Sequence, residues 1–305
     1  SIDLQDVSNL KSEQNSNGKY ETAQQHVSYD LTQKNSNTVA SDTQITVLTH
    51  GYGADASTWT NQVDEDSAES EFAPAKSSIV YKYWQKYGND LQVVFADIVK
   101  KSKDESVQFK DQYSELYKIN IYDLTEQTNS AFINDSFNSY TYTSKDFENL
   151  FDNFNSNNHL LVLFETCIDC DSNNNVYFQF NYLLSRIAKQ YKEKMNVLPK
   201  YNLIGHSRGG LTNLQYALDH PDMVDNLISM GTPYNGSTTA QVFGKLICKN
   251  GSKDALYDII DSAIYSQYKS RWNNNYNLYK NINAMAIGGY SSLWFFSDIL
   301  HNDPD

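Results

Sequence analysis

The hydrophobic pattern of the chain alternates between short apolar runs and longer amphipathic segments. Six runs have the composition of buried strands, at residues 45–49, 91–96, 160–164, 201–204, 227–230 and 283–290. Residues 79–87, 176–195 and 211–218 instead carry apolar side chains at helical spacing. Strands that alternate with helices in this order predict an α/β fold, with a mostly parallel sheet flanked by helices.

The same pattern divides the chain into regions. Residues 1–40 are polar, and we predict that they form an N-terminal strap before a single α/β domain at 41–305. Within that domain, residues 99–158 form a long polar stretch that we interpret as an insertion. Residues 254–271 are amphipathic and could either pack on the core or belong to a helical lid or cap over 238–282.

Composition and charge narrow the classes of partner. The chain has 305 residues and a net charge of −13, with no basic run, which argues against nucleic acid and against anionic membranes. No apolar run is long enough to span a bilayer. The polar start at Ser1, the acidity and the few cysteines favour a secreted or cell-surface protein of a Gram-positive type of bacterium.

Metal and cofactor motifs are missing from the sequence. Cys167 and Cys170 form one C-x-x-C pair, without the second ligand pair that a zinc site needs, and Cys248 is distant. The pair fits a local disulfide or two inert thiols better than a metal or redox centre. No D-x-D-x-D-G calcium loop occurs either, although the many acidic residues leave calcium binding open. We predict no cofactor and no metal.

The segment Gly205-His206-Ser207-Arg208-Gly209-Gly210 carries the main chemical signal. It lies between a short apolar strand and an amphipathic helix, which is the context that G-x-S-x-G requires. A turn this tight needs small residues on both sides of the serine and leaves the serine hydroxyl exposed at the end of the strand. The pattern therefore predicts Ser207 as a nucleophile at the carboxyl edge of the sheet.

Two other segments follow strands at the same predicted edge. His50-Gly51-Tyr52-Gly53 follows the strand at 45–49, where a serine hydrolase places a backbone N–H of its oxyanion hole. By position the two donors are the N–H groups of Tyr52 and Arg208, which leaves both side chains for substrate contacts. Gly231-Thr232-Pro233-Tyr234-Asn235-Gly236-Ser237 follows the strand at 227–230.

Together these three segments resemble the α/β-hydrolase family, in particular its bacterial lipases and esterases. The resemblance spans roughly residues 42–240 and rests on the H-G loop, the G-H-S-x-G-G turn and the G-T-P-x-x-G-S segment. It implies ester hydrolysis through an acyl-enzyme on Ser207, with Tyr52 and Arg208 as oxyanion donors. It also implies a helical lid after the G-T-P segment.

The acid and the base of the triad are harder to assign. The chain order in this fold is serine, acid, histidine, and His301 lies downstream but almost adjacent to Asp298 and Asp303. Residues 302–305 resemble the start of a lipase acid loop, which favours Asp303 as the acid, with Asp305 and Asp298 as alternatives. We therefore predict that a C-terminal segment is missing and that a separate fragment of the same protein supplies the histidine.

The sequence thus predicts a serine carboxylic-ester hydrolase, a lipase or esterase, whose substrate is a lipid or other ester with an apolar acyl group. An acyltransferase that uses the same serine remains an alternative, since an alcohol can replace water in the second step. A hydrolase-fold binding protein that has lost its base is the alternative from outside the enzymes.

Overall fold

The computed structural model describes residues 38–51, 54–60, 76, 78–100, 117–135, 143–165, 173–234, 268 and 270–288. Its strands are β1 (Ile45–Thr49), β2 (Leu91–Lys100), β3 (Tyr117–Asp123), β4 (Thr143–Lys145), β5 (His159–Glu165), β6 (Tyr201–His206), β7 (Val224–Met230) and β8 (Asn283–Ile287). Its α-helices are α1 (Ile79–Tyr87), α3 (Thr125–Asn134), α4 (Asn173–Met195), α5 (Arg208–Asp219) and α9 (Tyr276–Tyr279). Short 3-10 turns are η1 (Ala56–Trp59), η2 (Gly88–Asp90), η4 (Phe147–Asn149) and η5 (Pro221–Met223).

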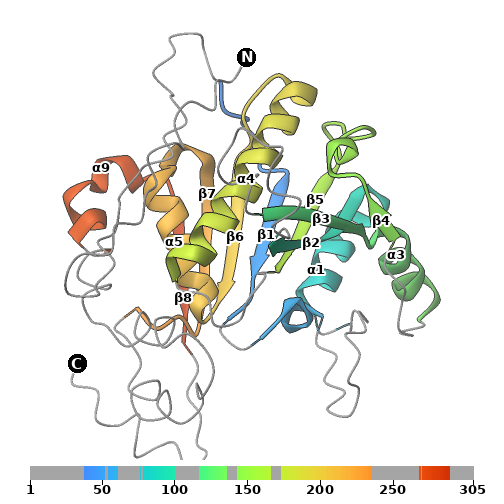
Figure 1. The fold of residues 1–305 in the computed structure, drawn as a ribbon, viewed down its shortest axis with the longest axis horizontal. Coiled ribbons are helices and arrows are strands. Elements are labelled where there is room, and N and C mark those ends of the chain that lie inside the picture. Colours follow the sequence, from blue (N-terminus) through green and yellow to red (C-terminus); the bar gives the residue numbers. More distant parts are fainter. Residues whose placement is uncertain are drawn as a thin grey trace, which may run out of the picture.

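The strands form one twisted sheet in the order β4-β3-β2-β5-β1-β6-β7-β8 (Figure 1). Strands β2, β5, β1, β6, β7 and β8 run parallel, whereas β3 is antiparallel to β2 and β4 is antiparallel to β3. The predicted α/β fold with a mostly parallel sheet is confirmed. Because parallel strands end at the same edge, the segments that follow β1, β5, β6 and β7 lie together.

The predicted helices form where the hydrophobic spacing placed them. Helix α1 has the predicted bounds; the Ser78 side chain caps its start by accepting a hydrogen bond from the N–H of Tyr81 at 3.2 Å, and Gly88 ends it with φ 53°. Helix α4 begins a few residues earlier than predicted and buries the predicted face. That face consists of Phe180, Leu183, Leu184, Ile187 and Tyr191.

Two apolar layers cover the two faces of the sheet. The larger layer joins α4 and α5 to one face, through side chains such as Val47, Val162 and Leu203. The other joins α1 and α3 to the opposite face, through their strand neighbours Leu48, Leu163 and Ile204. Successive strand residues point to opposite faces, so burial on both sides explains why these strands read as continuous apolar runs.

The polar region at 99–158 contributes strands to the sheet, which its sequence pattern did not indicate. Strands β3 and β4 extend the edge beside β2, and α3 lies between them in the chain (Figure 1). Only Tyr117 and Ile121 of β3 are buried. A strand near the edge that buries so few residues has no apolar run for periodicity to detect.

Several predicted features lie outside the described residues. These are most of the N-terminal strap, the three cysteines, most of the lid or cap region and the whole chain after residue 288. No helix among the described residues has the length and apolar character needed to cross a membrane. In the same part of the chain, no three His, Cys, Asp or Glu side chains are grouped as metal ligands would be.

Candidate active site

The backbone at Ser207 is strained. Ser207 joins the end of β6 to the start of α5 with φ 52° and ψ −125°. Among the described residues only Asp135 and Asn196 share a positive φ without being glycine, and Asp and Asn tolerate that region better than serine does. Such a conformation costs about 1–3 kcal/mol and persists where the surroundings enforce it. Here the Ser207 N–H donates to the Met230 carbonyl at 2.9 Å, which ties the turn to β7.

The three glycines around Ser207 leave no room for a side chain. A Cβ on Gly205 would lie 2.5 Å from the Gly210 nitrogen, and one on Gly209 would lie 2.1 Å from the Thr49 carbonyl oxygen. A Cβ on Gly210 would lie 1.9 Å from Thr232 Oγ1, within the G-T-P segment. The turn, the end of β1 and the segment after β7 are therefore in direct contact, as the sequence predicted from their separate positions.

Gly51, two residues after β1, lies against Ser207. A Cβ at Gly51 would lie 2.8 Å from Ser207 Cβ and 3.2 Å from His206 Nδ1. Behind it, Thr49 Oγ1 donates to Asn213 Oδ1 at 2.8 Å, which anchors the end of β1 to α5. The predicted oxyanion donor Tyr52 lies outside the described residues, so its role stays a prediction.

The side chain of Arg208 is buried, which differs from the prediction. Its N–H lies at the first position of α5, where helix N–H groups lack intrahelical partners and the dipole favours an anion. Its side chain, however, is only 1% exposed and is not available for substrate contacts as predicted. The reason is that the whole first turn of α5, Arg208 to Leu211, is enclosed by the surrounding chain.

Four titratable residues, Asp97, Glu165, His50 and His206, lie level with one another across the sheet, on or directly after β2, β5, β1 and β6. Asp97 pairs in register with Glu165, and His50 follows Thr49, which pairs with the residues before Glu165 and His206. Burial and the Glu165 charge raise the pKa of Asp97, against a hydrogen bond from Asn120 that lowers it. Burial and the neighbouring His50 lower the pKa of His206.

Glu165 is a site residue that the sequence analysis did not single out. One of its carboxylate oxygens lies 2.7 Å from His50 Nε2, and the other accepts the N–H of Ala56 at 2.8 Å. The sequence feature that could have identified Glu165 is a carboxylate directly after the buried run 160–164, at the edge of the sheet where Ser207 was predicted. Its pairing with His50 needed the strand order β5-β1-β6, which the hydrophobic pattern does not give.

No general base is identified among the described histidines. His159 begins β5 and His220 follows α5, so both lie at the opposite edge of the sheet, bonded to Thr46 and Asn181. His50 is held by Glu165 and by the Gly51 carbonyl. Within the described part, no imidazole is hydrogen-bonded to the Ser207 hydroxyl. The predicted acid Asp303, its alternatives Asp305 and Asp298, and His301 all lie outside it.

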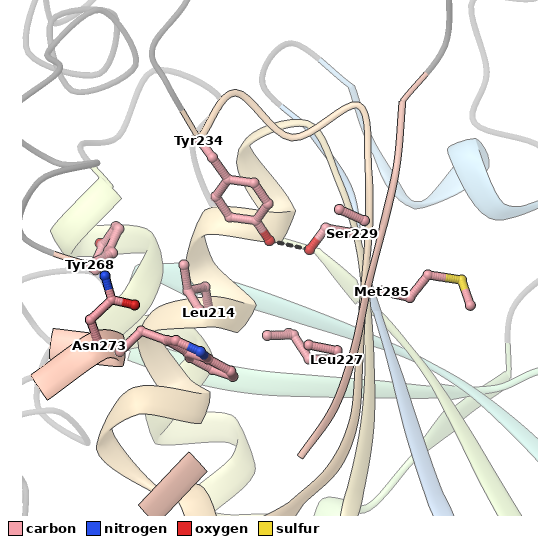
Figure 2. A pocket seen from close by; sticks show the side chains of 10 residues that line it. Leu214, Leu227, Ser229, Tyr234, Tyr268, Asn273 and Met285 are labelled. Carbon is pink, nitrogen blue, oxygen red and sulfur yellow. Dashed lines mark hydrogen bonds between the residues drawn. The ribbon is translucent and has the colours of Figure 1, made fainter. Parts of the chain in front are cut away.

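A cavity of about 340 Å³ lies between α5, the last two strands and the segment around Trp272 (Figure 2). Its lining is mostly apolar and includes Leu214 and Leu227. Its polar end is formed by the hydrogen bond between the hydroxyl groups of Ser229 and Tyr234 (Figure 2). None of the residues 205–210 lines it, so the cavity is separate from the serine turn.

Comparison with known proteins finds a match to one family model and several weak structural similarities. Residues 170–256, which include β6, the serine turn and α5, match the family model described as alpha/beta hydrolase fold. Among solved structures, the mature form of Bacillus licheniformis lipase BlEst2 is 14% identical, with a TM-score of 0.40 over 88% of this chain and 76% of that chain. Phospholipase PlaB from Legionella pneumophila, in complex with thio-NAD, is 12% identical, with a TM-score of 0.43 over 84% of this chain and 40% of that chain.

A third similar structure is FphF, a fluorophosphonate-binding serine hydrolase of Staphylococcus aureus. It is 12% identical, with a TM-score of 0.29 over 88% of this chain and 84% of that chain. The fold assignment rests on the family model and on the sheet topology rather than on these weak overall similarities.

Proposed function

We propose that this chain, which has an alpha/beta hydrolase fold, is a serine hydrolase that cleaves carboxylic esters with apolar acyl groups. The observation that carries the proposal is the backbone of Ser207. A serine in a strained conformation, enclosed by three glycines that admit no Cβ, is maintained at the carboxyl edge of the sheet. Strain of this kind is retained where function requires it.

The chemistry follows from the surroundings of the serine. The Ser207 oxygen attacks the ester carbonyl, the alcohol leaves, and water then releases the acid from the acyl-enzyme. The start of α5 supplies the Arg208 N–H and the positive end of a helix dipole, where the tetrahedral oxyanion develops. We expect the second donor to be the N–H of Tyr52, the residue that follows Gly51 in the chain, since Gly51 itself lies against the serine.

The imidazole that would take the serine proton is not among the described contacts, and one competing function remains. A hydrolase-fold binding protein would keep the same turn but lack a base for Ser207. In that case the hydroxyl would show the low reactivity of an ordinary serine. A reactive serine therefore separates the two functions.

The test is labelling of the wild-type chain with a fluorophosphonate probe, followed by mass mapping of the labelled peptide and hydrolysis of nitrophenyl esters of increasing chain length. We expect one label on Ser207, and a loss of ester hydrolysis of about 10³-fold or more in Ser207→Ala, since the serine carries the covalent step. Ser144→Ala, at an exposed position of β4, is the matched control. An unlabelled Ser207 with no hydrolysis would instead support the binding protein.

A further inference from the structure

We propose that Glu165 is a positioning residue of the reaction, and that with His50 it forms a brace which holds the loop after β1 against Ser207. The inference rests on the proposed function. Glu165 ends β5, whose neighbour β1 runs parallel to it and continues into this loop. The side chain of Glu165 is 15% exposed and that of His50 is 1% exposed, so the pair is shielded from water.

The carboxylate of Glu165 connects the two ends of the loop. Its Oε1 lies 2.7 Å from His50 Nε2, at the start, and its Oε2 accepts the Ala56 N–H at 2.8 Å, at the end. The contact with Nε2 is an ion-pair contact without the alignment of a hydrogen bond. Both carboxylate oxygens are thus occupied by the loop, and a single side chain on a buried strand fixes its span.

The His50 ring passes this constraint to the backbone next to the nucleophile. Its Nδ1 lies 2.8 Å from the Gly51 carbonyl oxygen, which can only accept, so Nδ1 carries a proton. Because a peptide group is planar, holding the Gly51 carbonyl fixes the plane of the peptide bond that follows, which contains the N–H of the predicted oxyanion donor.

The atoms around the peptide group of Gly51 leave it little room to move. Gly51 lies so close to Ser207 that a Cβ would be 2.8 Å from the serine Cβ. A Cβ on Gly209 would lie 2.1 Å from the Thr49 carbonyl oxygen and 2.6 Å from that of His50. A small movement of the loop therefore changes its distance from Ser207, and misplacement of about 1 Å in such a site costs about 10²-fold in rate.

Replacements at Glu165 separate geometry from charge. In Glu165→Gln the amide oxygen can accept the Ala56 N–H, and the amide nitrogen can donate to a neutral His50 at Nε2. The variant loses the charge but keeps the bridge. Glu165→Asp keeps the charge but is one methylene too short to reach both groups. A positioning role predicts that Gln is the better replacement, whereas a role of the charge predicts Asp.

The experiment measures kcat and KM for a nitrophenyl ester in the wild type, Glu165→Gln, Glu165→Asp and Glu165→Ala. We expect kcat within about threefold of the wild type for Gln, and about 10- to 100-fold lower for Asp and Ala, with KM nearly unchanged. Glu148→Ala, which removes an exposed glutamate paired with Arg186, is the matched control and should retain the wild-type kcat. An unchanged kcat in Asp and Ala, or an effect on KM alone, would overturn the proposal.

A second measurement does not depend on catalysis. Amide hydrogen exchange of a peptide covering residues 48–60 should be about tenfold faster in Glu165→Asp than in the wild type, and unchanged in Glu165→Gln. Equal exchange rates in all three proteins would contradict the proposed brace. Failure of the proposed function looks different, since the wild-type chain would then neither label at Ser207 nor hydrolyse the ester.

Discussion

Gly209→Ala is expected to destabilise the protein by about 3 kcal/mol or more, because the added methyl group meets backbone atoms that cannot move alone. The Cβ would lie 2.1 Å from the Thr49 carbonyl oxygen and 2.7 Å from the Thr49 carbonyl carbon. Gly209 is the second residue of α5. Helix propensity alone predicts the opposite sign, a gain of about 1 kcal/mol for alanine over glycine.

Chemical denaturation of the wild type, Gly209→Ala and Gly288→Ala checks this expectation. Gly288 is the matched control, because a Cβ there would meet no atom within 4 Å among the described residues. Gly288→Ala should change stability by less than about 1 kcal/mol. A Gly209→Ala protein as stable as the wild type would contradict the close contact between β1 and α5.

Acidification is expected to weaken the fold through His159, well away from Ser207. Burial, together with the charge of Lys86, lowers the pKa of His159 from 6.5 to about 3. Between these values the unfolded chain binds a proton that the folded chain does not, so stability is complete above pH 6.5 and falls as the pH drops. From pH 7 to pH 5 this one residue should cost about 2 kcal/mol.

A neutral His159 ring fits the hydrogen bonds around it. Thr46 Oγ1 donates to Tyr83 Oη at 3.0 Å and accepts from Asn202 Nδ2 at 3.2 Å. A hydroxyl has one proton and two lone pairs, so Thr46 has one lone pair left to accept from the Nε2–H of His159, 2.9 Å away. A ring with its single proton on Nε2 satisfies this contact while it is neutral. The ring also stacks on Tyr87, with centroids 4.3 Å apart.

Urea denaturation at pH 7 and pH 5 measures the effect, with His159→Gln as the variant that cannot titrate. The loss of stability between the two pH values should be smaller in His159→Gln than in the wild type by about 2 kcal/mol. His206→Gln removes a more exposed histidine and should change this difference less. A folded-state titration of His159 near pH 6.5 by NMR would contradict the prediction.

The sequence predicted the buried core and the position of the serine turn better than the rest of the candidate site. Strands buried on both faces appear as apolar runs, and a glycine-serine-glycine turn between a strand and a helix is typical of a nucleophile. The strands β3 and β4 were not predicted because a sheet edge imposes little hydrophobic pattern. The side chain of Arg208 was predicted to be available for substrate contacts. It is buried instead, because the position of a residue in the motif does not show how tightly α5 packs.

The sequence by itself determined the fold class and the place of Ser207, because both depend on local patterns: strand and helix periodicity, and the small residues that a tight turn demands. Only the tertiary structure decided that Gly51 lies against Ser207, that Arg208 is buried, and that Glu165 joins His50 to Ala56. These are contacts between residues up to about 150 positions apart. They exist because β5, β1 and β6 are neighbours in the sheet, an order set by the packing of the whole domain.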